Sequence, residues 1–165
     1  MRNTIRVSTV LVGLLSLAAT AVQAQSANIQ ALANVYQAIA VTGARDLDFQ
    51  VVFPGVNKTI AVGDATSGRF DLTGQASANV NVSFTLPTNL VNGGNNLAIA
   101  NWTGCSNPTN TTASCSAFTP SAGNTARAFS GAGALFVWVG AQVQPTAGQT
   151  AGSYLGTVTL TAAYF

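Results

Sequence analysis

Alternation of apolar and polar residues with a period of two runs through most of the chain after residue 24. Residues 79–86 (NVNVSFTL) are the clearest case, and their apolar positions are Val80, Val82, Phe84 and Leu86. In an extended strand, such alternation puts every second side chain on one face. No stretch keeps the 3.6-residue period of an amphipathic helix. The pattern therefore predicts an all-β fold.

Residues 1–24 have the three parts of a secretory signal peptide. Arg2 and Arg6 give a basic start, an apolar run follows, and the small residues before and at Ala24 resemble a cleavage site. The apolar run is shorter than the ~18–20 residues that a membrane-spanning helix needs. We therefore expect a mature chain from Gln25, secreted through the periplasm to the cell surface or the medium, with no transmembrane segment.

The charged residues after the signal peptide exclude several function classes. Basic and acidic side chains balance, so charge gives no reason to expect a nucleic-acid partner. The sequence has no His and no Glu, which leaves no recognisable catalytic triad and few metal ligands. Asp46 and Asp48 are interpreted as a solvated strand face. We predict a non-catalytic protein with no cofactor and no metal site.

The chain from Gln25 to Phe165 reads as one domain of short strands. Residues 134–143 (ALFVWVGAQV) are apolar on both faces, which is typical of a central strand. The sequence Asn92-Gly93-Gly94-Asn95 predicts a tight turn. We expect residues 104–133 to be irregular, and we expect strands at 28–41, 46–53, 58–62, 68–73, 79–86, 97–102, 134–143 and 152–165. This set fits an immunoglobulin-like antiparallel β-sandwich.

For two of these strands, the sequence also predicts the conformation or the inward-facing side chains. Residues 28–41 are rich in Ala and can also be drawn as a short helix, but their alternation favours extended structure. In residues 46–53 the inward side chains are expected to be Leu47, Phe49, Val51 and Phe53.

Cys105 and Cys115 lie ten positions apart in a loop rich in Pro, Asn and Thr. A metal pair would need further ligands, and neither a His nor a third Cys is present. In an exported protein we therefore predict a disulfide that closes a local loop. Trp102 lies beside this loop, where its indole can either stack on a sugar ring or cover the end of the core. It is a candidate ligand contact.

Several short motifs, in their order along the chain, resemble those of a known family. They are Leu47-Asp48-Phe49, Phe84-Thr85-Leu86-Pro87, and the closing run AGQTAGSYLGTVTL at residues 147–160. Together they resemble an uncharacterised family of secreted bacterial β-sandwich proteins. This family is itself similar to the spore coat protein U domain and to the subunits of chaperone-usher pili.

The likeness to pilus subunits is most specific at the C-terminus. Tyr164 is the penultimate residue and Gly152 is the fourteenth from the end. Apolar or small residues at Tyr154, Val158, Leu160 and Ala162 share the face of Tyr164. The resemblance implies a sandwich that lacks one strand. A periplasmic chaperone fills the groove beside the last strand, and at the usher the N-terminal extension of the next subunit replaces it.

By this resemblance, residues 25–34 are the donor segment, with Ile29, Ala31 and Ala33 as inserted side chains. The segment lacks a Gly between its apolar positions, and the Cys pair lies late in the chain. Residues 25–41 can therefore also form the first strand of the domain's own, complete sandwich. The sequence predicts a structural subunit of a surface fibre or coat that binds copies of itself or related subunits. The alternative is a carbohydrate-binding, adhesin-like module.

Overall fold

The computed structural model describes residues 25–165, so the predicted signal peptide lies outside the described residues. The chain separates into two units, of which the second is Val35–Phe165. In the first unit, residues 25–34 have no regular secondary structure and their side chains are exposed. This differs from the expected strand or helix over residues 28–41, of which only the last two residues are in a strand.

The second unit is built from strands. Their bounds are β1 Ala40–Arg45, β2 Lys58–Ile60, β3 Gly68–Thr73, β4 Asn79–Thr85, β5 Asn89–Asn92, β6 Asn95–Asn107, β7 Ser116–Phe118, β8 Thr125–Ala128, β9 Ala134–Gln144 and β10 Thr159–Tyr164. The predicted all-β class is confirmed. The predicted strands at 58–62, 68–73, 79–86 and 134–143 correspond to β2, β3, β4 and β9.

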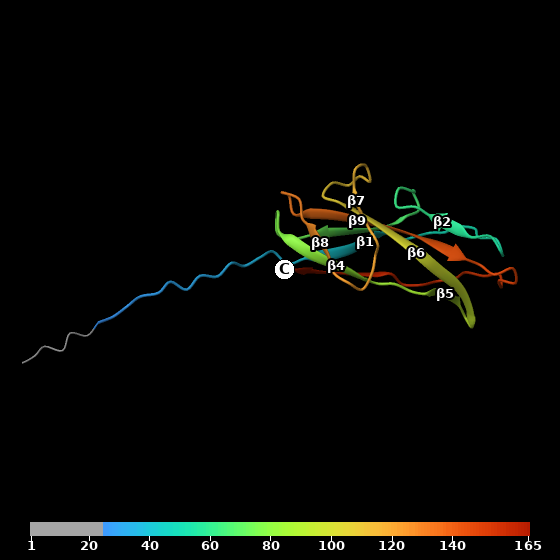
Figure 1. Cartoon of the computed structure of the whole chain (residues 1–165), viewed down its shortest axis with the longest axis horizontal. Coiled ribbons are helices and arrows are strands. Elements are labelled where there is room, and N and C mark those ends of the chain that lie inside the picture. The colour runs from blue at the N-terminus through green and yellow to red at the C-terminus, as the bar shows by residue number, and fades with distance from the viewer. Residues whose placement is uncertain (1–24) are drawn as a thin grey trace, which may run out of the picture. The chain divides into compact units, whose positions relative to one another are not determined.

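The strands form two antiparallel sheets that pack as a sandwich (Figure 1). The larger sheet has the order β1-β3-β9-β6-β5, with β2 also paired to β9 and β7 to β6. The smaller sheet has the order β10-β4-β8. β9 is the central strand of the larger sheet, as its two apolar faces predict: Val137 is 0% exposed and its neighbour Trp138 is 3% exposed.

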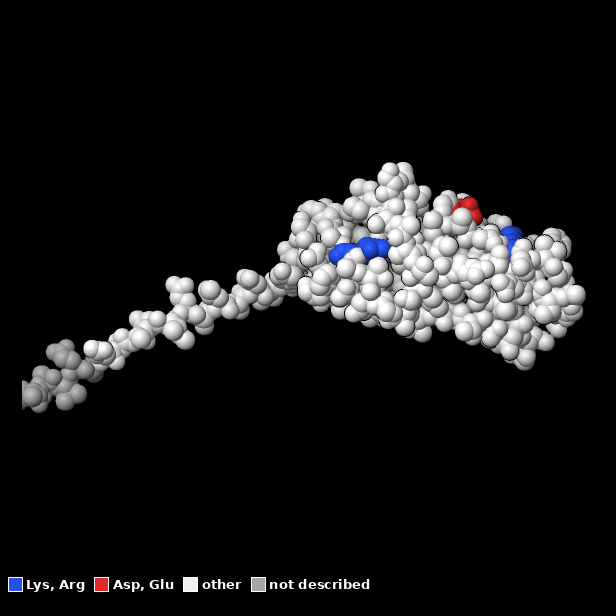
Figure 2. Space-filling model, in the orientation of Figure 1, with Lys and Arg blue, Asp and Glu red and all other residues white. Residues whose placement is uncertain are grey.

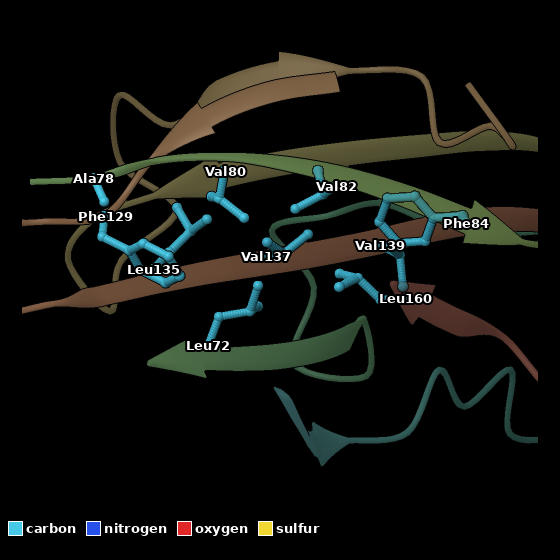
Figure 3. Packing of buried hydrophobic residues seen from close by; sticks show 10 residues of the cluster. All are labelled: Leu72, Ala78, Val80, Val82, Phe84, Phe129, Leu135, Val137, Val139 and Leu160. Atoms are coloured by element: carbon cyan, nitrogen blue, oxygen red, sulfur yellow. The ribbon is translucent and has the colours of Figure 1, made fainter. Parts of the chain in front are cut away.

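The main core cluster lies between the two sheets (Figure 3). From the smaller sheet, the alternating residues of β4 point inward, and from the larger sheet β3 and β9 supply the facing side chains. The buried members of this first core cluster are Leu72, Ala78, Val80, Val82, Phe84, Phe129, Leu135, Val137, Val139 and Leu160. Full burial of one such Val, Leu or Phe side chain stabilises the fold by about 1.5–3 kcal/mol.

The expected strand over residues 46–53 is wrong, because the chain turns in its middle. Gln50 has a positive φ of 55°, and its N–H donates to the carboxylate of Asp48 at 2.7 Å. An Asp side chain that binds the backbone two residues later is typical of a turn. Phe49 stays buried, but Phe53 is 66% exposed. For the same reason Asp46 and Asp48 do not share a strand face.

Two further boundaries differ from the prediction. Residues 104–133, expected to be irregular, contain the end of β6, all of β7 and all of β8. The last strand, expected over 152–165, is limited to β10, because residues 152–158 form a single bridge, Leu155 to Val91 of β5. The predicted turn at residues 92–95 is confirmed: it joins β5 to β6, with Gly93 at φ 58°.

Candidate functional site

β10 lies at the edge of the smaller sheet. Among residues 25–165, it pairs with β4 alone, with Leu160 opposite Phe84 and Tyr164 opposite Val80. β1 lies at the edge of the larger sheet and approaches β10. An edge strand presents N–H and C=O groups that can pair with an added strand. Within residues 25–165, β10 therefore has one edge that is not paired with another strand.

The inward face predicted for the last strand is confirmed. Leu160 is 7% exposed, and Val158, Ala162 and Tyr164 pack against the first core cluster. Phe165 points away from it and is 66% exposed. Whether these residues also contact another subunit stays a prediction.

Tyr164 connects the end of β10 to the first residues of the domain. Its O–H donates to the carbonyl of Gln37 at 2.6 Å, and it accepts a hydrogen bond from the N–H of Gln75 at 2.7 Å. The ring of Tyr36 packs edge-on against it at 5.2 Å between centroids. This role of Gln37 could not be predicted from the sequence, in which Gln37 only interrupts an apolar alternation. The chain therefore enters the domain beside Tyr164.

A hollow of about 950 Å³ lies beside β1 and the segment just before β10: Gly43 and Arg45 line it, as do Gly156 and Val158, but no residue of β10 does. We call this hollow the groove. The residues that line it come from β1, β3, β5, β6, β9, the turn at 46–54 and the segment 145–158. Its apolar lining includes Leu47, Phe49, Phe70, Leu97, Ile99, Val139 and Val158. Val139 and Val158 belong to or pack on the first core cluster, whereas Phe49, Leu97 and Ile99 belong to a second one. The groove is therefore a gap between two parts of the core.

The groove is larger than the voids inside protein cores, and it is partly open to solvent. Cores are close-packed, and voids larger than a water molecule are few. An engineered apolar cavity of only about 150 Å³ is large enough to hold benzene. The groove is several times larger, and Phe49, Leu97 and Ile99 lie in its wall although each is less than 10% exposed. It has room for a row of side chains.

Gly152 and Tyr154 lie at one end of the groove. Gly152 has a φ of 148°, a conformation that other residues rarely adopt, and a Cβ at this position would collide with the side chain of Asn92. The O–H of Tyr154 donates to the carbonyl of Thr150 at 2.7 Å. Neither residue is in β10, so the structure separates them from the strand in which the sequence placed them. The local structure therefore accounts for both residues, Gly152 through its backbone conformation and Tyr154 through its hydrogen bond.

Trp102 also lines the groove. It is partly buried and packs against the second core cluster, whose buried members are Phe49, Ile60, Leu97, Ile99, Ala141 and Val143. This position agrees with a tryptophan that covers the end of a core. A sugar contact by Trp102 stays a prediction.

The predicted disulfide between Cys105 and Cys115 is confirmed, with 5.7 Å between the two Cα atoms. The loop that it closes is organised by the buried Asn107. The amide of Asn107 donates to the carbonyl of Thr111 at 2.9 Å, and its oxygen accepts from the N–H of Thr109 at 3.0 Å. None of these residues lines the groove, so the loop and the groove are separate features.

Charged side chains are sparse on the face in Figure 2. Arg45, at the wall of the groove, donates from Nε to the carbonyl of Ser67 at 2.6 Å and from Nη2 to the Ser67 hydroxyl at 2.7 Å. Burial lowers the pKa of Arg127, whose guanidinium lies 4.7 Å from the centre of the Phe118 ring. Arginine stays charged at neutral pH even so. Asp46 and Asp48 line the groove together with Arg45, so its lining combines charged and apolar side chains.

The described part of the chain, residues 25–165, contains no helix long and apolar enough to span a membrane. Neither the curated proteins nor the solved structures contain a match to the chain. A family model does match: it is described as "Domain of unknown function (DUF4402)" and covers residues 37–164, from the Gln37 that contacts Tyr164 to Tyr164 itself. Because this match includes most of the chain, the protein belongs to the DUF4402 family.

Proposed function

We propose that this protein is a non-catalytic structural subunit of a bacterial surface fibre or coat, whose copies join by adding a β-strand to the groove beside β10. The observation that carries the proposal is a partly apolar groove of about 950 Å³ that reaches Gly156 and Val158, immediately before β10, a strand that pairs on one side only among residues 25–165. The donor is the segment 25–34 of a second copy.

The free edge of β10 supplies the backbone part of the binding site. Each hydrogen bond to an added strand contributes about 0.5–1.5 kcal/mol net. The exposed side chains on this strand are Thr159, Thr161 and Ala163, none of them charged. Natural proteins often protect an edge with charges or Pro residues. This edge has neither, which favours its use in strand addition.

The groove supplies the side-chain part. An added strand presents every second side chain to the groove. In residues 25–34 the register with Ile29, Ala31 and Ala33 inward puts small and medium side chains there, and Val35 continues the row. Ile29 is 95% exposed and Val35 is 93% exposed. Burying one such side chain fully contributes about 1.5–3 kcal/mol.

The length of the donor also fits. Residues 25–34, if fully extended, span about 33 Å at ~3.3 Å per residue. The 11 residues of β9, which run along the sandwich, span a similar distance. One donor segment is therefore long enough to follow the groove and the free edge of β10 together.

The proposed assembly has consequences for other partners. Before assembly, an exposed groove of this kind favours aggregation, so a periplasmic chaperone would cover it, and an usher would direct the exchange. These partners follow from the likeness to pilus subunits. The carbohydrate-binding alternative depends on Trp102, whose partial burial against the second core cluster gives it no added support.

Deletion of residues 25–34 tests the proposal. The mature chain is expected to form multimers that resist SDS without heating, and the deletion is expected to remove them. In the full chain, Ile29→Asp should have the same effect, because the charge would be buried in the groove. Leu32→Asp is the matched control: Leu32 is also exposed, at 87%, but points the other way in the same strand.

The readouts are SDS gels of unheated samples and sedimentation. A mature chain that stays monomeric at high concentration, with the same melting temperature when a peptide of residues 25–35 is added, would contradict the proposal. Equal loss of multimers in Ile29→Asp and Leu32→Asp would contradict the register.

A further inference from the structure

Large apolar side chains are exposed at two places in the domain. One group lies in the turn at 51–56 and at Leu155, and we call it the tip: Val51, Phe53, Val56 and Leu155 are 68%, 66%, 58% and 77% exposed. The other group lies where the chain enters and leaves the domain, and we call it the base: Val35, Tyr36 and Phe165 are 93%, 55% and 66% exposed.

The tip and the base lie at opposite ends of the sandwich. The first residue of β9, Ala134, pairs with Thr73, next to the Gly74 that contacts Tyr164 and Phe129. The other end of β9 is followed by Thr146, whose carbonyl accepts from the N–H of Gly55 in the tip turn. β9 separates the two ends by about 33 Å. In Figure 1 the C-terminus and the β2–β5 end of the domain are correspondingly far apart.

The direction of the donor strand decides which ends of two copies meet. β10 runs from the tip side, at Thr159, to the base, at Tyr164. A donor antiparallel to β10 therefore has residue 34 at the acceptor's tip. The donor's own domain begins at Val35, in its base. Antiparallel addition thus brings the base of one copy to the tip of the next.

The parallel direction gives a different assembly. Residue 34 of the donor would then lie at the acceptor's base, so two bases would meet. Two copies could exchange arms and close a symmetric dimer. Both tips would stay in water. Antiparallel pairing is also slightly more stable per residue.

The apolar surface at both ends distinguishes these cases. Single exposed apolar residues are ordinary, but the tip gathers Val51, Phe53 and Val56 within one short turn. In antiparallel addition this surface has a partner of the same character on the next copy. We propose that the tip of one copy packs against the base of the next, so that subunits join head to tail in an open chain. This inference rests on the proposed strand addition and adds a second contact between the same two copies.

Cysteine cross-linking in the full chain tests the contact. The variant with both Phe53→Cys and Phe165→Cys has one new thiol at each end, while Cys105 and Cys115 are already bridged to each other. After mild oxidation we expect a ladder of multimers that survives heating in SDS and disappears with a reductant. The control pairs Phe53→Cys with Thr85→Cys, because Thr85 is exposed on β4 of the smaller sheet, opposite Thr159 and five residues from the Val80 that pairs with Tyr164 at the base. It should give no ladder.

The outcomes separate this contact from strand addition, which is measured on the same samples without heating. Unheated multimers with no cross-link in the Phe53/Phe165 pair would overturn the tip–base contact and leave strand addition in place. Covalent dimers from Phe165→Cys alone would show that two bases meet, which also overturns it. A ladder that forms only by cross-linking, with no unheated multimers, would support the contact and reject strand addition. Loss of the unheated multimers together with the cross-linked ladder would reject both strand addition and the tip–base contact.

A second variant measures how much the contact contributes. Phe53→Asp places a charge in the tip without touching the groove, since Phe53 does not line it. We expect shorter unheated multimers than in the unmodified chain, whereas Thr85→Asp, on the exposed face of β4, should leave their length unchanged. Equal multimer lengths in the two variants would argue against a tip–base contact.

Discussion

The two halves of this sandwich are covered differently, although β9 runs through both. Along the first part of β9, Leu135, Val137 and Val139 face the smaller sheet and are at most 1% exposed. Beyond Gly140, Ala141 and Val143 lie in the second core cluster, beside the turn at 46–54 and the segment before β10. The first half is closed by strands, and the second by irregular segments.

This difference shows where the packing between the sheets is least regular. In the closed half, each strand of the smaller sheet contributes alternating side chains that fill the space above the larger sheet. In the open half, Phe49 and Tyr154 come from chain segments without a sheet partner, and the groove remains between them and Val139. Close packing is the rule in protein interiors. The open half is therefore the part of the molecule in which an added strand increases burial most.

The largest expected effect compares a leucine in each half. Leu72→Ala, in the closed half, removes a side chain that is 1% exposed, and such changes cost about 2–5 kcal/mol in the free energy of unfolding. Leu97→Ala is the matched change in the wall of the groove, where Leu97 is 5% exposed. Its cost should lie at the low end of this range, because Leu97 borders the groove, so its neighbours can relax toward that space more easily than those of Leu72.

Urea unfolding of the chain without residues 25–34 measures both costs with no donor segment present. If the loss at Leu97 equals or exceeds the loss at Leu72, the two halves are equally well packed and the comparison above is wrong. Adding the peptide of residues 25–35 sharpens the test, since it should stabilise the unmodified domain more than the Leu97→Ala variant.

The closed half could be predicted from the sequence, and the open half could not. Strands β4 and β9 have strong period-two or fully apolar patterns, and both were predicted within a residue or two. The turn at 46–53 has the same alternation, but the Asp48 carboxylate binds the N–H of Gln50 and reverses the chain. A local polar contact overrides the apolar pattern there. Beyond this turn, Val51 and Phe53 are 68% and 66% exposed instead of buried.

Only part of the candidate site could be predicted, because alternation shows which face of a strand is buried but not which distant residues it contacts. The inward face of Val158, Leu160, Ala162 and Tyr164 follows from alternation, and so does the outward position of Phe165. The contacts of Tyr164 with Gln37 and Gln75 are long-range and depend on how the two sheets pack. β8 was missed because its residues, Thr-Ala-Arg-Ala, carry too little apolar area to form a pattern.

An effect of intermediate size on the free energy of unfolding is expected at Tyr164, where the closed half contacts the first residues of the domain. Tyr164→Phe keeps the ring contacts with Tyr36 and Phe129 but removes the hydroxyl that bonds to Gln37 and Gln75. Two hydrogen bonds of about 0.5–1.5 kcal/mol each are lost, which predicts a decrease of about 1–3 kcal/mol in the free energy of unfolding. Hydrogen exchange should also speed up at Gln75, whose N–H loses its acceptor. Unchanged exchange there would contradict the assigned contact.

The smallest expected effect on stability lies at Phe165, which is exposed and belongs to neither half of the core. Phe165→Ser should change the free energy of unfolding of the isolated domain by no more than about 0.5 kcal/mol, as is usual for exposed positions without special contacts. The same change removes apolar surface from the base, so the multimers of the full chain should become shorter. Tyr164→Phe is the informative comparison, because it should weaken the domain while leaving the base apolar. Melting temperature and multimer length are measured on both variants. Tyr164→Phe should lower the melting temperature more, and Phe165→Ser should shorten the multimers more. A destabilised Phe165→Ser domain with multimers of normal length would assign Phe165 to the fold and remove it from the interface.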